Sequence, residues 1–128
     1  MRALILLLGL IIAPTALGDQ TADVKAIRLK LHTALSLSTQ QRHAELFEAL
    51  ALPSEVKRLR EEGSYEQKLK KFAEKKQPAL QWLLRLMLDS RVRIEFADDG
   101  QTAAFFLSES GGRLATMLRE EGGWYLRN

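Results

Sequence analysis

The chain has 128 residues, 46% of them hydrophobic and 27% charged, a balance that is typical of a folded domain and excludes a disordered chain. This length is enough for one hydrophobic core but not for two. The sequence contains no cysteine, so no disulfide holds the fold together. A formal net charge of +3 is too small to indicate a polyanionic partner by itself.

The N-terminal segment has the order of a cleavable secretory signal peptide. Arg2 supplies a positive charge, and residues 3–12 form an apolar stretch. Ala16-Leu17-Gly18 then places small side chains at the −3 and −1 positions of a cut before Asp19. This order predicts that residues 1–18 are a signal peptide.

A retained membrane anchor is the alternative for this segment. The uncharged run over residues 3–18 includes Pro14 and is shorter than the roughly 20 residues that a membrane-spanning helix needs. Cleavage is therefore favoured, and the mature chain is predicted to be a single domain over residues 19–128. We expect it to be exported, to the periplasm or the medium, and to contact a membrane only through the signal peptide before cleavage.

Helical periodicity dominates the first part of the mature chain. Apolar residues recur at spacings of three and four over residues 22–37, which predicts a first helix. A second helix is expected to start at Ser38 and to be stopped by Pro53. A short, highly charged helical turn is expected over residues 54–63, with Gly63 at its end.

The longest helix is expected over residues 65–88 and changes character at Pro78. Proline has no amide hydrogen for the helical ladder, so a kink or break is predicted near Gln77. The part before Pro78 is amphipathic, whereas the part after it is apolar on nearly every face. A helix of the latter kind is buried on more than one side, and we expect this one to lie between a sheet and either the first helices or a partner.

From Arg91 onward the apolar pattern changes to the two-residue period of β-strands. Turns rich in Asp and Gly separate four such segments, at residues 91–96, 101–108, 113–119 and 124–127. Consecutive strands joined by tight turns form an antiparallel meander. The sequence therefore predicts an α+β domain in which N-terminal helices pack on one face of a four-stranded antiparallel sheet.

Both faces of this sheet carry apolar side chains, which is more than a sheet with one solvated face requires. Phe105 is assigned to the core and Phe106 to the other face of the second strand. Leu118 is assigned to the core and Met117 to the other face of the third strand. Phe106 and Met117, with Trp82 of the long helix, are therefore predicted to form a ligand- or partner-binding surface. The alternative is a sheet that is covered by the chain's own helix or curled on itself.

The last strands carry a resemblance to a known superfamily. The ending Arg119-Glu120-Glu121-Gly122-Gly123-Trp124-Tyr125-Leu126 resembles the last hairpin of nuclear transport factor 2-like (cystatin-like) domains, including small exported bacterial members. The segment from Asp99-Gly100 to Ala103-Ala104-Phe105 is similar to their central hairpin. The resemblance implies helices on a curved meander that encloses a pocket. Many members carry a short hairpin where residues 54–63 are helical in pattern here, which implies a reduced cone.

Catalytic or metal-binding residues are not indicated by the pattern. The two histidines, His32 and His43, lie on different expected helices and lack a partner at the spacing of a metal ligand. Enzymes of the resembled superfamily use a pocket aspartate or histidine as a base, but Asp98 and Asp99 are explained by the turn that they form. We therefore predict no catalytic residue, no metal and no cofactor, with a small pocket enzyme of isomerase or hydrolase type as the alternative.

A cluster of lysines marks the long expected helix, and its members are Lys68, Lys70, Lys71, Lys75 and Lys76. The cluster is interpreted either as a solvated helix face or as a contact for an anionic partner such as phospholipid head groups. No aromatic residue interleaves the lysines, so nucleic acid is not an expected partner.

The predicted function is that of an exported, non-enzymatic domain that binds a small apolar ligand or a protein partner through its sheet face. The partner considered first is a second copy of the chain, as a homodimer. A dry apolar cavity would favour the ligand, whereas a flat apolar face would favour the partner. A lysine-mediated binder of the cell-envelope surface is a further alternative.

Overall fold

The computed structural model describes the backbone of residues 2–107 and 111–127, and side chains from residue 20 onward. Helices come first and strands last, as the sequence predicts. In chain order the elements are α1 (Arg2–Thr39), α2 (His43–Leu50), α3 (Pro53–Glu62), α4 (Tyr65–Lys71), the π-helical turn η1 (Phe72–Lys76), α5 (Gln77–Met87), β1 (Val92–Phe96), β2 (Thr102–Leu107), β3 (Arg113–Glu120) and β4 (Gly123–Leu126). The predicted end of the second strand, Ser108, lies outside the described residues.

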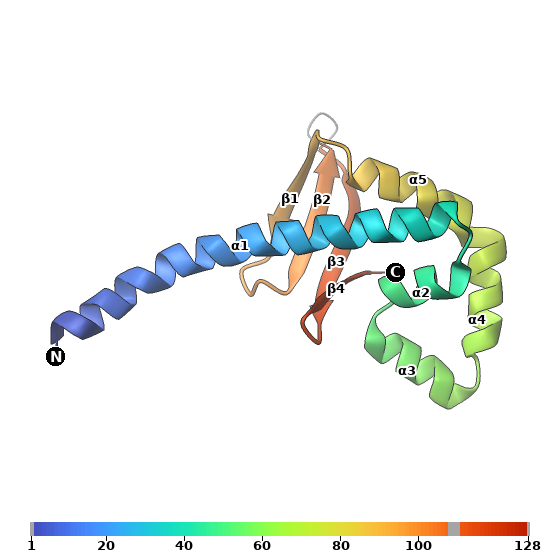
Figure 1. Cartoon of the computed structure of the whole chain (residues 1–128), viewed down its shortest axis with the longest axis horizontal. Coiled ribbons are helices and arrows are strands. Elements are labelled where there is room, and N and C mark those ends of the chain that lie inside the picture. The colour runs from blue at the N-terminus through green and yellow to red at the C-terminus, as the bar shows by residue number, and fades with distance from the viewer. Residues whose placement is uncertain (1, 108–110, 128) are drawn as a thin grey trace.

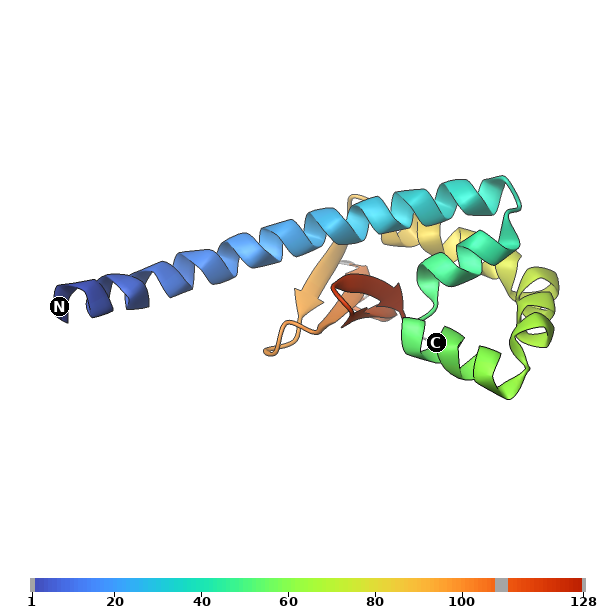
Figure 2. The ribbon, with the colours of Figure 1, turned by 60° about the horizontal axis from the view of Figure 1, so that its bottom comes forward.

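The fold is α+β, with helices packed on one face of an open antiparallel sheet (Figures 1 and 2). The strand order is β1-β2-β3-β4, so the predicted meander and fold class are confirmed. The C-terminal half of α1 crosses the sheet, and its N-terminal half extends away from the rest of the chain (Figure 1). α2 and α5 pack beside α1, and the contacts between helices and sheet are concentrated on β3 and β4.

α1 ends at Thr39, two residues later than predicted, and a glutamine takes the position after the helix that glycine usually occupies. Gln41 has a left-handed backbone conformation with φ 57°, which glycine usually adopts after a helix. Its N–H donates to the carbonyl of Ser38 (3.1 Å), and the N–H of Arg42 donates to the carbonyl of Leu37 (3.0 Å). The prediction of a second helix that starts at Ser38 is therefore wrong: Ser38 belongs to the last turn of α1, and α2 begins at His43.

The long helix that the sequence predicts over residues 65–88 consists of three segments, α4, η1 and α5. Pro78 lies in the first turn of α5, where its missing amide hydrogen costs no helical bond. The turn before it is widened, because the N–H of Gln77 donates to the carbonyl of Phe72, five residues back. The irregularity thus lies where Pro78 predicts it and takes the form of a π turn.

α5 is apolar on nearly every face, and most of these faces pack against the rest of the domain. Leu84 and Met87 are buried in the core, whereas Trp82 on a different side of the helix is 66% exposed. α5 contacts both α1 and β3, so it packs against the first helix and the sheet, as the sequence predicts. The side that carries Trp82 is exposed.

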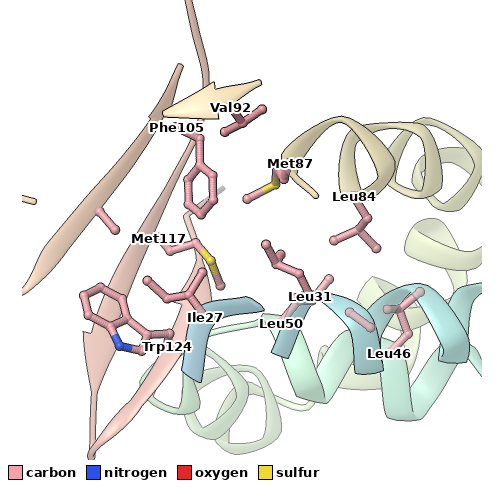
Figure 3. Packing of buried hydrophobic residues seen from close by; sticks show 12 residues of the cluster. Ile27, Leu31, Leu46, Leu50, Leu84, Met87, Val92, Phe105, Met117 and Trp124 are labelled. Carbon is pink, nitrogen blue, oxygen red and sulfur yellow. The ribbon is translucent and has the colours of Figure 1, made fainter. Parts of the chain in front are cut away.

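The main hydrophobic core lies between the sheet, the C-terminal half of α1, and α5 (Figure 3). Ile27 and Leu31 of α1 and Met87 of α5 point toward Phe105 and Met117 of the sheet. Large side chains from three elements thus meet in one layer, which supplies the apolar burial that a chain without disulfides requires.

Met117 belongs to this core, which corrects the predicted orientation of the third strand. Met117 is 0% exposed. The register between β2 and β3 shifts between Phe105 and Phe106, where Arg113 faces Phe106. Such a β-bulge adds one residue to β3 and reverses the alternation of side chains beyond it. If side chains alternated without interruption from Leu114, Leu118 would face the core. Because of the bulge, Met117 faces the core instead.

Polar contacts also connect α1 to α2, β3 and β4. Asp23 forms an ion pair with Arg119 of β3. The ammonium of Lys30 donates to the carbonyl of Ala49 (2.6 Å) and lies over the ring of Tyr125, 4.3 Å from its centre. Burial lowers the pKa of Lys30. α1 is therefore attached to α2, β3 and β4 by polar as well as apolar contacts.

The two adjacent phenylalanines of β2 test this register. Phe105 is fully buried, whereas Phe106 lies between the guanidinium groups of Arg93 and Arg113, which are 5.0 and 5.8 Å from its ring centre. We expect Phe105→Ala to lower the free energy of unfolding by about 3–5 kcal/mol. Phe106→Ala should lower it by about 1 kcal/mol or less, the scale of an exposed cation–π contact. Urea denaturation measures both, and equal losses would contradict the register.

Candidate functional site

An open groove of about 470 Å³ lies among α2, α3, the α4–η1–α5 segment and the end of β4. This volume falls within the roughly 300–1,000 Å³ of small-molecule sites. Its apolar floor is formed by side chains that include Phe47, Leu50, Phe72, Leu80, Leu83 and Leu126. The groove is the candidate functional site.

Aromatic packing holds the helices that form the groove. The ring of Phe47 in α2 meets the ring of Phe72 in η1 edge-on, with 5.3 Å between their centres, and the ring of Tyr65 in α4 at 6.0 Å. Val56 and Leu59 of α3 are buried in the same cluster. These residues form a second, smaller core, so Phe47 and Phe72 are packed on one side and line the groove on another.

Polar contacts fix the same helices from outside. The hydroxyl of Tyr65 donates to one carboxylate oxygen of Glu48 (2.9 Å), and Arg60 donates to the other (2.9 Å). Arg60 also lies over the ring of Tyr65, 4.6 Å from its centre. Burial, followed by the hydrogen bond to Glu48, raises the pKa of Tyr65, so its hydroxyl remains a donor at neutral pH. These contacts link α2, α3 and α4.

The start of α3 is held from the sheet. Glu120, at the end of β3, accepts hydrogen bonds from the backbone N–H of Ser54 (2.7 Å) and from its hydroxyl (2.9 Å). A carboxylate at a helix N-terminus satisfies amides that have no helical partner and is favoured by the helix dipole. The wall of the groove that α3 forms is thus attached to β3.

Cationic side chains also line the groove, four of them from α4 and η1, and together they are called its cationic rim. Glu55 supplies one carboxylate, and the five cationic lining residues are Lys68, Lys71, Lys75, Lys76 and Arg127. Within the described residues none of these five cations forms an ion pair. Three of the lysines follow the three-and-four spacing of one helix face. The π turn brings the fourth to the same side, because residues five apart are neighbours there.

The residues that the sequence assigns to a binding surface are not brought together. Trp82 is exposed on α5, Phe106 lies on the open face of the sheet, and Met117 is buried in the core. These three residues do not line the groove, whereas four of the five clustered lysines do, and Lys70 does not. The apolar floor carries no sequence signal, because its residues come from distant segments and each belongs to an ordinary apolar stripe.

No protein family, curated protein or solved structure matches this chain. Among the residues that the structure describes, no three His, Asp or Glu side chains gather as metal ligands. Over the same residues there is no helix that is long and apolar enough to cross a membrane. The chemistry of the groove is therefore inferred from its own side chains.

The wall formed by η1 and α5 is anchored to α1 through Gln77. Its amide donates to the carbonyl (2.9 Å) and the hydroxyl (2.8 Å) of Ser38, which is 1% exposed. We expect Gln77→Ala to lower the free energy of unfolding by about 1–3 kcal/mol, the cost of a buried hydroxyl that loses its donor. The carbonyl of Ser38 keeps the N–H of Gln41 as a donor. Gln67→Ala, at an exposed position of α4, should change it by less than about 0.5 kcal/mol. Urea unfolding measures both, and a loss no larger at Gln77 than at Gln67 would refute the anchor.

Proposed function

We propose that this domain binds a single-chain anionic amphiphile, such as a fatty acid, in the groove. The observation that carries the proposal is the presence of the apolar floor and the cationic rim at one site. The acyl chain lies on the floor, and the carboxylate is held among the cations of the rim.

The amphiphile accounts for both parts of the groove. A neutral apolar ligand uses the floor but leaves the clustered lysines to repel one another. A soluble polyanion uses the rim but leaves contiguous apolar surface in water, which is unfavourable. A ligand with an apolar chain and an anionic end covers the floor and neutralises the rim together.

Lysine suits this task because its alkyl stem packs on apolar surface while its ammonium stays in water. The floor and the rim contribute differently to affinity. Each methylene group that leaves water contributes about 0.8 kcal/mol, so affinity rises with chain length until the floor is filled. The contribution of the rim is electrostatic and decreases as salt is added.

The proposal keeps the apolar ligand that the sequence predicts and moves its site from the sheet to the helical layer. The resemblance to nuclear transport factor 2-like domains implies a pocket on the inner face of the sheet. Core side chains such as Phe105 and Met117 occupy that face here. The proposal also joins the apolar ligand to the lysine-mediated contact, which the sequence offers as a separate alternative.

Two adjacent lysines of α4 provide a matched test, because Lys71 lines the groove and Lys70 does not. We expect Lys71→Glu to weaken the binding of decanoate about threefold to tenfold at low ionic strength, since attraction to the carboxylate becomes repulsion. Lys70→Glu makes the same change in net charge and should alter the affinity by less than about twofold. Isothermal titration calorimetry measures each dissociation constant.

Decanol, which has the same chain length and no charge, separates the floor from the rim. It should bind the unchanged protein and Lys71→Glu equally well. Ala79→Asp places a charge on the floor and should weaken both ligands, because Ala79 lines the groove from α5. The proposal fails if decanoate shows no saturable binding, or if Lys70→Glu weakens it as much as Lys71→Glu does.

We further infer that the ligand is met outside the cytoplasm, after removal of residues 1–18. The support is the order of positive, apolar and small-residue regions before Asp19. Exported material should therefore begin at Asp19 by N-terminal sequencing. Gly18→Phe should slow the removal, since a large side chain then stands next to the cut. An intact N-terminus on material in the membrane fraction would overturn this inference.

A further inference from the structure

β1 is an edge strand with outward backbone groups. Within the described residues its strand partner is β2, and it stands first in the sheet order. The N–H of Ala97 donates to the carbonyl of Thr102 (2.9 Å). In the antiparallel register, hydrogen-bonded pairs recur at every second residue, so Arg93 and Glu95 form the bonded pairs with β2. The N–H and C=O of Ile94 therefore point away from β2, toward the edge.

The core face of the sheet is incompletely covered at this edge. Ile94 and Phe96 pack against the core but remain only half-buried. The helices contact the sheet mainly at β3 and β4, which explains the exposure at β1. Of the features that protect an edge, residues 92–96 contain no proline, no lysine and no bulge, and their two charges, Arg93 and Glu95, are of opposite sign.

The charges of β1 are complementary to those of an identical strand. Arg93 and Glu95 lie on the open face, are about half exposed, and pair with each other at 2.7 Å. An exposed pair of this kind contributes little within one chain, so its partners are exchanged at little cost. Opposite charges that face each other across two strands stabilise the pairing.

We propose that two copies of this chain pair through β1, antiparallel, about a two-fold axis at Ile94. The outward N–H and C=O of Ile94 then bond to the same groups of the second copy. Arg93 faces Glu95 of the second copy on both sides of the axis, and Val92 faces Phe96. All five residues of β1 face a residue of the second copy in this register. The N–H of Val92 already donates to the carbonyl of Asp89 (3.1 Å). The bonds across the axis therefore come from Ile94 and from the N–H of Phe96 to the carbonyl of Val92.

The charges select this register over its neighbours. A symmetric pairing must match outward groups with outward groups, so the alternatives are displaced by two residues. One alternative places Arg93 opposite Arg93 of the second copy, and the other places Glu95 opposite Glu95. Like charges directly opposite each other are destabilising, and both alternatives leave part of β1 unpaired.

The groove lies at the other end of the sheet, where Leu126 of β4 contributes to its lining. Pairing at β1 therefore leaves the groove open, and the inference stands independently of the proposed ligand. The two four-stranded sheets become one continuous sheet.

Charge reversal tests the pairing. Arg93→Glu and Glu95→Arg each turn both cross-strand attractions into repulsions, so each should raise the dissociation constant of the dimer about tenfold or more. The double variant restores opposite charges on exchanged sides and should return to within about threefold of the unchanged chain. Lys57→Glu and Glu61→Arg make the same charge changes at exposed positions of α3 and should have no effect. Sedimentation equilibrium of the full chain over a concentration series measures each constant.

Hydrogen exchange at the Ile94 amide gives a second measurement, which needs no variant. The exchange of this amide should slow as the concentration of the unchanged chain rises, because pairing places it in a hydrogen bond. Circular dichroism and thermal melts establish that each variant is folded. The inference is overturned if the chain is monomeric at every concentration, if a folded single variant dimerises as tightly as the unchanged chain, or if the folded double variant does not recover.

Discussion

The missing amide hydrogen of Pro78 constrains the helical segment on which the groove depends. A continuous α-helix through this position would leave the carbonyl of Glu74 without a partner and press it against the proline ring. The segment instead makes one π turn, in which Gln77 bonds five residues back to Phe72. The added residue changes the phase of the helix, so that Phe72 lies on the floor of the groove and Lys76 joins its rim. The same segment places Gln77, the first residue of α5, in hydrogen-bond contact with Ser38 at the end of α1.

Within the described residues, the cations that line the groove are not paired with carboxylates. Lys30 has a carbonyl and an aromatic ring as partners, although burial lowers its pKa. Lys71 and Lys75 are four residues apart, and like charges at this spacing destabilise a helix by about 0.2–0.5 kcal/mol. Glu66 and Glu74 belong to the same segment but do not line the groove. The groove is positively charged because four lysines of this segment line it and the two glutamates do not. A bound anion would reduce the repulsion among these lysines.

The fold class could be predicted because the apolar period changes only once, from helical to alternating, near Arg91. Single-residue events escaped prediction. A β-bulge places Met117 in the core where the alternation predicts Leu118, and no proline or glycine marks the shift in the sequence. Gln41 ends α1 in a left-handed conformation for which glycine is the usual signal. The lysines of the candidate site were visible because they are contiguous in the chain. The floor was not, because Leu50 and Leu126 become neighbours of one groove only after the sheet has packed on the helices.

Pairing at β1 relates the two copies of the chain by a two-fold axis, so that the β4 strands form the two outer ends of the joined sheet. Facing residues of an antiparallel pair point to the same side of the sheet, so the two-fold axis is perpendicular to it. Both helical layers then lie on one side of the joined sheet, each with its groove near β4, far from the axis. The proposed pairing and the proposed ligand site are therefore compatible, because β1 and the groove lie at opposite ends of each four-stranded sheet. The charges of β1 and the clustered lysines of α4 and η1 act on different partners, and neither requires the other.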